Sequence, residues 1–278
     1  MEFAELSTRP WTEFSFVAFD LETSGAYPIG SEIIEFGGVK WRGGEEVESY
    51  QTLLKPRELL SAFNISIHGI TNEMVADAPL LSDKINEIRN FIEGSILMAH
   101  HAPFDMGFVA VDFEKYGISF PKEPVICTSL LARKMIPESP NHKLQTLIKV
   151  LNLVGGQAHR GLDDARACLQ LGLLCMERVG AQASLGQVLE KVEKNLIWPN
   201  FLVQGSGNSK IQMAAKALYE KKNLDIIYEG GSLKGTRRLS PQGIVRNPDG
   251  DYLQALCHID GISKRFYFDK IKDIQMVF

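Results

Sequence analysis

The sequence has few cysteines and no long apolar run, and both absences narrow the class of protein. Its 278 residues include four cysteines, none of which form a C-x-x-C pair, so neither a zinc knuckle nor a redox motif is predicted. No apolar stretch is long enough to span a bilayer, and the first six residues lack the basic and apolar regions of a signal peptide. We therefore expect no membrane segment, a cytoplasmic location and reduced thiols.

Charge is unevenly distributed along the chain. The net charge of −4 argues against a protein that coats nucleic acid without specificity. Residues 205–278, however, contain 12 lysines and arginines against 8 acidic residues, whereas the remaining residues contain 18 against 26. This division predicts two modules with different roles, and the acidic one suits a site that gathers carboxylates around metal ions.

The apolar pattern of the first 180 residues predicts an α/β domain with a mixed sheet. Strands are expected first, at residues 14–19, 32–41 and 47–54, with a hairpin at Gly43-Gly44 between the last two. Helices and one short buried strand then follow by the spacing of their apolar residues. The helices are expected at residues 82–92 with Ser82 as N-cap, 104–116, 143–151 and 163–176, and the strand at 96–99.

The remainder of the chain predicts a helical connector and a small all-β domain. A helix is expected at residues 184–196, a flexible linker at 205–209 and a further helix at 210–221. Strand-like runs separated by Gly, Asn-Pro and Asp-Gly turns follow at 224–230, 236–245, 252–259 and 264–271. We expect domains at residues 10–180, 181–222 and 223–278.

Acidic residues recur at the edges of predicted elements. Asp20 and Glu22 end a strand and share a face, and two such close carboxylates repel unless cations lie between them. Asp105 stands in the first turn of a helix, and His159 precedes Asp164 at the start of another. Each signal has an ordinary alternative, namely a solvated turn, a helix-dipole partner, an N-cap or a surface histidine. Their joint occurrence in this order favours a metal site.

Three motifs carry a family resemblance over residues 14–178. FDLETSG at 19–25, HHAPFD at 100–105 and HRGLDDA at 159–165 resemble the DEDDh (DnaQ-like) 3′→5′ exonucleases, which include the proofreading subunit of bacterial replicative polymerases. The resemblance implies a ribonuclease H-like mixed five-stranded sheet and two divalent cations, Mg²⁺ or Mn²⁺. It assigns Asp20, Glu22, Asp105 and Asp164 to the metals, His159 to the general base, and Leu21, Thr23, His101 and Phe104 to the terminal nucleotide. His101 stands where the family often has Asn, and Cys127 where many relatives have Asp.

The tail carries a second resemblance. Tyr228, Arg237-Arg238-x-x-Pro241, Tyr252-Leu253 and Arg265-Phe266-x-x-Asp269-x-Ile271 resemble the WYL domain, an SH3- or Sm-like β module, although Asp251 replaces the Trp of its name. The resemblance implies that this module binds nucleic acid or nucleotide-like ligands and regulates an attached domain. Its candidate binding residues are Arg237, Arg238, Tyr252 and Arg265, and the equal alternative is ordinary surface arginines on a docking barrel.

Together these patterns predict a metal-dependent 3′→5′ exonuclease that releases nucleoside monophosphates from single-stranded nucleic acid, with DNA favoured over RNA. The alternatives are an exonuclease of RNA or oligoribonucleotides, and a nucleic-acid-sensing regulator on a nuclease scaffold. A polymerase or repair complex is the expected protein partner, and no feature fixes the oligomeric state.

Overall fold

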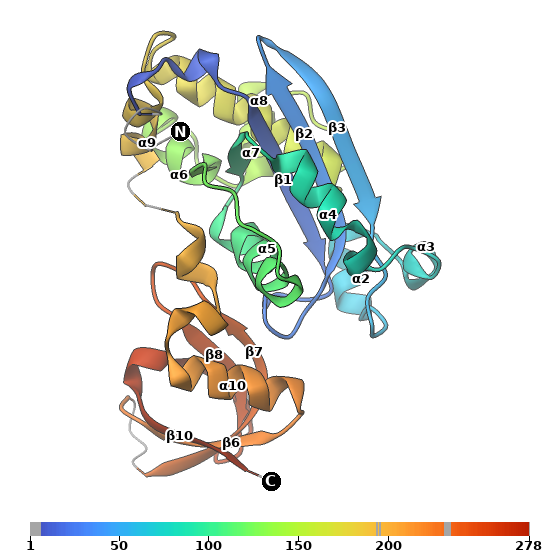
Figure 1. Ribbon diagram of the computed structural model, residues 1–278, viewed down its shortest axis with the longest axis vertical. Coiled ribbons are helices and arrows are strands. Elements are labelled where there is room, and N and C mark those ends of the chain that lie inside the picture. The colour runs from blue at the N-terminus through green and yellow to red at the C-terminus, as the bar shows by residue number, and fades with distance from the viewer. Residues whose placement is uncertain (1–6, 193, 195, 231–234, 278) are drawn as a thin grey trace. The chain divides into compact units, whose positions relative to one another are not determined.

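The chain forms two compact units. The computed structural model describes residues 7–192, 194, 196–230 and 235–277 (Figure 1). The first unit contains the N-terminal residues up to Ser24 together with residues 33–105 and 120–196. The second contains residues 197–278 and two segments from earlier in the sequence, Gly25–Glu32 and Met106–Ser119. Within the described residues, no helix has both the length and the apolar character needed to cross a bilayer.

The first unit is built on a five-stranded mixed sheet, as the sequence predicts. The strand order is β3-β2-β1-β4-β5, in which β1 pairs antiparallel with β2 and parallel with β4. Strand β2 pairs antiparallel with β3, and β4 pairs parallel with β5. The three-residue β5 is too short for its apolar pattern to be distinguished in the sequence. The bounds are β1 Phe16–Thr23, β2 Ile33–Arg42, β3 Glu45–Leu53, β4 Ile96–Ala99 and β5 Val125–Cys127.

Eight helices begin or lie in the described part of the first unit. Helix α4 begins at Leu81 rather than at a Ser82 cap, because the Asp83 carboxylate accepts the backbone N–H of Leu80 and so caps the first turn. Their bounds are α2 Ala62–His68, α3 Asn72–Val75, α4 Leu81–Ile92, α5 Pro103–Tyr116, α6 Thr128–Met135, α7 Leu144–Leu151, α8 Gly161–Val179 and α9 Leu185–Val192.

Strand β2 presents different residues to the two faces of the sheet. Phe36 packs against the Phe91 ring of α4, with ring centroids 6.2 Å apart. Gly37 points to the other face, where α8 lies so close that an added Cβ would fall 2.0 Å from the carbonyl carbon of Gly161. The absence of a side chain at position 37 therefore allows the N-terminus of α8 to rest on the sheet. Large apolar side chains such as Phe16, Phe19 and Phe36 are fully buried in this unit, and each contributes about 2–3 kcal/mol to its stability.

The second unit contains the predicted small all-β fold. Its antiparallel sheet has the order β10-β6-β7-β8-β9, and α10 (Ser209–Tyr219) packs on β6, β7 and β10. The strand expected at 264–271 is instead two strands, because a 3₁₀ turn at Phe268–Lys270 separates β9 from β10. The bounds are β6 Asn223–Tyr228, β7 Thr236–Val245, β8 Tyr252–Cys257, β9 Ile262–Tyr267 and β10 Ile271–Val277.

The expectation of a flexible linker at residues 205–209 is wrong. Residues Gln204–Ser206 form a 3₁₀ turn, and the Asn208 side chain caps α10 by accepting from the backbone N–H groups of Lys210 and Ile211. Glu114 of α5 holds the turn from outside: its carboxylate accepts the N–H groups of Val203, Gln204 and Gly205 at 2.8, 3.1 and 2.7 Å. Composition alone indicated a linker, because this anchor lies about 90 residues earlier in the chain.

The segment Gly25–Glu32 is paired with the β-domain. Ile29 and Ile244 exchange two backbone hydrogen bonds, at 3.3 and 3.0 Å. Gly243 allows this approach, since an added Cβ would fall 2.3 Å from Cβ of Tyr27. The buried core of the second unit accordingly includes Ile29 and, from α5, Val111.

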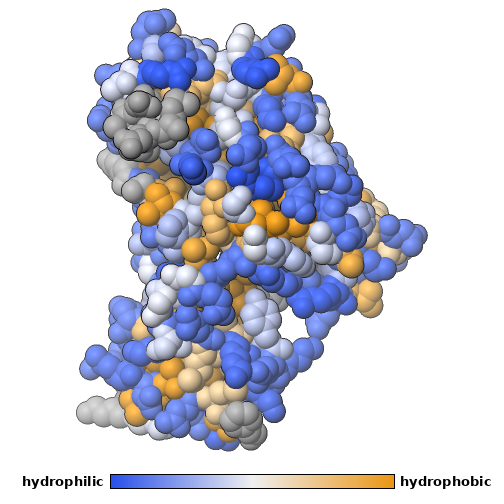
Figure 2. All heavy atoms as spheres, in the orientation of Figure 1, coloured by the Kyte–Doolittle hydropathy of each residue, from blue (hydrophilic) through white to orange (hydrophobic). Residues whose placement is uncertain are grey.

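Hydrophilic side chains dominate the face seen in Figure 2, and apolar side chains appear between them in smaller areas. Some of the exposed apolar side chains come from the segment around α2 and α3, namely Leu59, Phe63, Ile67 and Met74.

Candidate active site

Two carboxylates come from the end of β1. Asp20 and Glu22 are two residues apart on the strand, so their side chains leave the same face. Asp20 is opposite Gly37 and Glu22 is opposite Glu35 in the β1–β2 pairing. Glu22 is 8% exposed, and Asp20 is partly buried. The buried Leu21 between them donates its backbone N–H to Oδ1 of Asp105 at 3.3 Å, which ties β1 to the start of α5.

Asp105 stands in the first turn of α5, directly after β4 and a tight turn. His101 in that turn has φ 71°, a left-handed conformation that is uncommon for a residue other than glycine. Asp105 is 2% exposed. The helix N-terminus favours a negative charge at this position, which offsets only part of the cost of burying the carboxylate.

Asp164 stands in the first turn of α8, and both of its carboxylate oxygens accept hydrogen bonds. Nε2 of Gln145 donates to Oδ1 at 3.0 Å, and the backbone N–H of His159 donates to Oδ2 at 2.9 Å. Sequence reasoning missed Gln145, which stands in the predicted helix at residues 143–151 as an ordinary polar residue. Asp164 is thus oriented by α7 and by the loop that carries His159.

The motif residues converge on one hollow of about 200 Å³. One ligand atom each of Glu22, His159 and Asp164 lies within 4.8 Å of the other two, an arrangement that can hold a metal ion. Of the residues expected to contact a nucleotide, Leu21, His101 and Phe104 line the hollow, whereas Thr23 lies outside its lining. The full lining is Asp20, Leu21, Glu22, His100, His101, Phe104, Asp105, His159 and Asp164.

Burial raises the pKa values of the four acids, and repulsion from the other acids adds to this effect at Asp20 and Glu22. Burial and the neighbouring Asp105 and Glu22 hold the pKa of Asp20 well above its ordinary value. Burial, followed by the charge of Asp164, raises the pKa of Glu22 to about 8, and burial raises the pKa of Asp105 to about 8. The pKa of Asp164 is raised as well, mainly by burial. Four carboxyl groups gathered in one hollow are a donor set suited to hard divalent cations, which prefer oxygen ligands.

His100 lines the hollow, but both of its ring nitrogens contact groups outside the lining of the hollow. Its Nδ1 contacts Oγ1 of Thr128 at 3.0 Å, and its Nε2 contacts the carbonyl oxygen of His142 at 2.9 Å. Burial lowers the pKa of His100 to about 4, so its ring is neutral at physiological pH. The side chain therefore joins the end of β4 to α6 and to the segment before α7.

The candidate binding residues of the tail fall into two groups. Tyr252 and Arg265 lie together on neighbouring strands, with the guanidinium 4.8 Å from the ring centroid. Arg238 is exposed and forms two hydrogen bonds of 2.9 Å with Asp225. Arg237 is 4% exposed and lies 5.5 Å from the Tyr228 ring centroid, with Nη2 donating to the carbonyl oxygen of Gly230. The two adjacent arginines therefore point to opposite faces of β7.

A mixed sheet that brings three buried carboxylates, one partly buried carboxylate and one histidine to a single hollow defines a metal-dependent nuclease. Residues 17–171 match the family described as Exonuclease, which is more than half of the chain, and the chain therefore belongs to this family. Residues 209–276 match the WYL domain. Both resemblances predicted from the motifs are confirmed.

Similar curated proteins are bacterial polymerases. The PolC-type DNA polymerase III of Bacillus subtilis is 38% identical over 185 residues, which is 66% of this chain and 13% of the polymerase. That of Oceanobacillus iheyensis is 40% identical over 155 residues, which is 56% of this chain and 11% of the polymerase. The chain thus spans only a small part of the length of these relatives.

Solved structures of nucleases share the fold. The nuclease domain of 3′hExo, a DEDDh family member bound to rAMP, is 20% identical with a TM-score of 0.52, and the match covers 63% of this chain and 96% of that domain. The zinc-bound complex of E. coli ExoI with single-stranded DNA is 14% identical with a TM-score of 0.55, and the match covers 88% of this chain and 55% of that one.

Proposed function

We propose that the chain is a 3′→5′ exonuclease that removes nucleoside monophosphates from single-stranded DNA. One observation carries the proposal: Asp20, Glu22, Asp105 and Asp164 meet in one hollow, where burial raises the pKa of each carboxyl group. DNA is favoured because the curated relatives are DNA polymerases. RNA is the second candidate, because one structure of the same fold holds rAMP.

In this proposal the four acids supply oxygen ligands for two divalent cations, Mg²⁺ or Mn²⁺. Such cations activate a water molecule, neutralise charge on the scissile phosphate and stabilise the leaving alkoxide. His159 accepts the proton of the attacking water, since its exposed side chain reaches the hollow beside Glu22 and Asp164. The partly exposed Phe104 ring stacks on the terminal base, and Leu21 and His101 complete the nucleotide pocket.

A degradation assay on 3′-labelled and 5′-labelled single strands of DNA and RNA tests this function. With Mg²⁺ or Mn²⁺ we expect stepwise loss from the 3′ end, faster on DNA, and no cleavage with EDTA. Asp20→Asn and Asp105→Asn abolish cleavage, whereas the control Asp77→Asn, at an exposed position outside the hollow, retains it. Cleavage that resists EDTA, or that begins at the 5′ end, contradicts the proposal, and faster RNA cleavage supports the second candidate.

For the tail we propose that Tyr252 and Arg265 hold the single strand, because an arginine above a partly exposed aromatic ring can stack with bases and bind phosphates. We also propose a polymerase or repair complex as partner, since the curated relatives are replicative polymerases. Size-exclusion chromatography of the chain mixed with a purified replicative polymerase tests this partner, and separate elution argues against it.

A further inference from the structure

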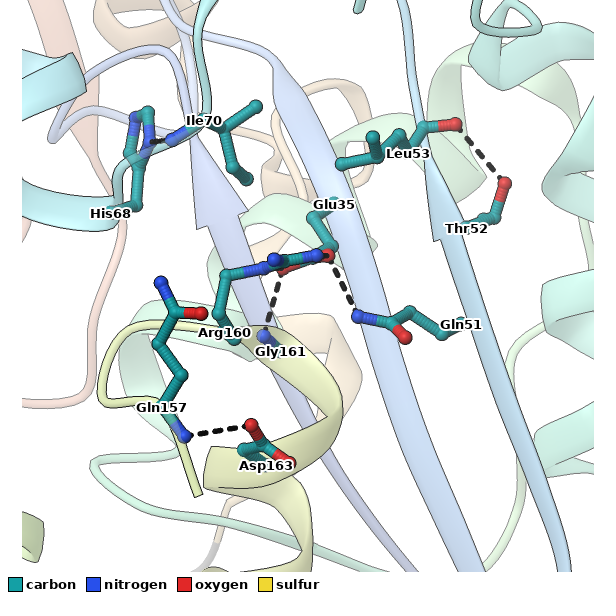
Figure 3. A network of polar contacts seen from close by, with 10 residues as sticks. All are labelled: Glu35, Gln51, Thr52, Leu53, His68, Ile70, Gln157, Arg160, Gly161 and Asp163. Carbon is teal, nitrogen blue, oxygen red and sulfur yellow. Dashed lines mark hydrogen bonds and ion pairs between the residues drawn. The ribbon is translucent and has the colours of Figure 1, made fainter. Parts of the chain in front are cut away.

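A fifth carboxylate, Glu35 on β2, lies beside the candidate metal ligands but is used differently. It is fully buried and stands directly opposite Glu22 in the β1–β2 pairing. A buried carboxylate is costly unless donors surround it, and Glu35 has three (Figure 3). Arg160 and Gln51 donate to Oε1 at 2.9 Å each, and the backbone N–H of Gly161 donates to Oε2 at 2.8 Å. With its oxygens engaged in this way, Glu35 is poorly placed to bind a cation.

Two of these donors directly follow His159 in the sequence. Arg160 is the N-cap residue of α8, but its side chain makes no cap hydrogen bond to the helix. The first backbone N–H of the helix, that of Gly161, instead donates to the Glu35 carboxylate on β2. The Arg160 guanidinium contacts the same carboxylate through two nitrogens: Nε lies 3.3 Å from both oxygens, and Nη2 donates to Oε1. The carboxylate therefore fixes both the side chain of residue 160 and the first turn of α8.

The backbone at His159 requires such anchoring. Its φ of 59° is left-handed, which costs a residue with a side chain about 1–2 kcal/mol. On the N-terminal side of the loop, the N–H of Gln157 is held by Oδ2 of Asp163 at 2.8 Å, and the N–H of His159 by Oδ2 of Asp164 at 2.9 Å. Glu35 supplies the anchor on the C-terminal side, so the loop is fixed at both ends.

We infer that Glu35, acting through Arg160, is a positioning residue that holds His159 at the hollow. The inference rests on the proposed exonuclease function for its kinetic consequence and on hydrogen bonds alone for its structural one. The two neighbouring glutamates thereby have separate roles, since Glu22 is available to a cation and Glu35 holds the loop of the proposed base.

The experiment compares Arg160, at the N-cap of α8, with Arg166, within α8, because both arginines form an ion pair with a glutamate. Arg166 and Glu46 repeat the geometry, with Nη2 2.9 Å from Oε1, but both side chains are about 40% exposed and neither lines the hollow. We expect Arg160→Gln to lower kcat about tenfold to a hundredfold, while KM for the oligonucleotide and the dissociation constant for Mn²⁺ change less than about twofold. Arg166→Gln leaves all three unchanged. Arg160→Lys keeps the positive charge but cannot donate from two nitrogens to Glu35, so we expect its kcat to lie between those of wild type and Arg160→Gln.

Hydrogen–deuterium exchange of the metal-free protein gives a readout that does not need activity. Arg160→Gln accelerates exchange of the amides at residues 157–161 relative to both wild type and Arg166→Gln. Glu35→Gln does the same if it folds, and the double variant Glu35→Gln/Arg160→Gln loses no more kcat than the worse single variant. If circular dichroism shows that Glu35→Gln does not fold, the comparison of Arg160→Gln with Arg166→Gln still tests the inference.

Two results overturn the inference: unchanged exchange at residues 157–161 in Arg160→Gln, or a kcat equal to that of Arg166→Gln. The variant His159→Ala separates this failure from a failure of the proposed function. If His159→Ala loses turnover while Arg160→Gln does not, only the positioning role is wrong. If wild type degrades neither DNA nor RNA, the proposed function is wrong, and the exchange measurement still tests the anchor.

Discussion

Glu22 and Glu35 face each other across β1 and β2, and the two carboxylates have different surroundings. Glu35 accepts hydrogen bonds from Arg160, Gln51 and Gly161, whereas Glu22 lines the hollow with the other acids. In the proposed function, neighbouring backbone and side-chain donors, rather than residue type, therefore decide which of the two acids is available to a cation.

Removing cations should make stability depend on pH. The pKa values of Glu22 and Asp105 are raised to about 8 from ordinary values of 4.5 and 3.8. The folded state therefore binds more protons than the unfolded state between about pH 4 and pH 8, and stability falls as pH rises through this range. We expect the melting temperature in EDTA to fall from about pH 5 to about pH 8, and Mn²⁺ to restore it most at the upper end. Glu22→Gln should flatten the dependence, and a melting temperature in EDTA that rises over this range contradicts the prediction.

His159→Ala should separate proton transfer from metal binding. Loss of a general base lowers kcat by about a hundredfold or more, and we expect calorimetry to show nearly unchanged Mn²⁺ affinity. A matched control is His258→Ala, since His258 is an exposed histidine of the second unit that contacts Ser240. If Mn²⁺ affinity falls together with kcat, His159 is a metal ligand rather than the base.

Gly37→Ala should damage the site from a distance. The added methyl group would lie 2.0 Å from the carbonyl carbon of Gly161, so α8 must move away from the sheet or the sheet must distort. We expect a loss of roughly 2 kcal/mol or more in the free energy of unfolding, measured by urea denaturation, together with lost turnover. In the control Gly155→Ala, the methyl group meets only the side chain of Ile148, at 3.1 Å, and the loss should be smaller. Equal stability of the two variants would count against this account.

Glu114→Ala should destabilise the second unit. Three backbone N–H groups would lose a charged acceptor, and each such hydrogen bond is worth about 1.5–3 kcal/mol. We expect the melting temperature to fall by several degrees and exchange at residues 203–206 to accelerate. Glu190→Ala, at an exposed position of α9, serves as the control and should leave both unchanged.

Arg265→Ala should weaken binding of single strands if the tail holds them. The guanidinium above Tyr252 is exposed, and we expect fluorescence anisotropy to show lower affinity with a salt slope reduced by about one. Arg238→Ala should have less effect, because Asp225 already neutralises that arginine. Unchanged affinity and salt slope in both variants favour a docking barrel over a nucleic-acid-binding one.

The sequence predicts the residues of the hollow because they lie in motifs at the edges of elements. Asp20, Glu22, Asp105, His159 and Asp164 each lie near the end of a strand or the start of a helix, and the structure brings them together. Glu35 and Gln145 could not be found in this way, because their partners are distant in sequence and nothing in an apolar strand or an amphipathic helix marks them. The sheet was predictable from apolar periodicity, except for the three-residue β5.

The boundary between the two units was harder to predict, because two residues in the core of the second unit lie outside the tail. Ile29 follows the first motif and Val111 follows the second, and both appear in the sequence as ordinary apolar residues of the nuclease region. Their pairing and burial with the β-domain depend on Ile244 and on the turn that Glu114 holds, which are contacts that periodicity does not encode.

The sharing of residues between the two units limits how the protein can be rearranged. A nuclease segment cut after residue 196 would retain Ile29 and Val111 but lose the sheet and α10 that bury them. Such a fragment would carry newly exposed apolar surface, and it would be prone to aggregate. Recombination or gene fusion that exchanges the tail alone would remove the partners of Ile29, Val111 and Glu114, so the two modules are expected to be inherited as a pair.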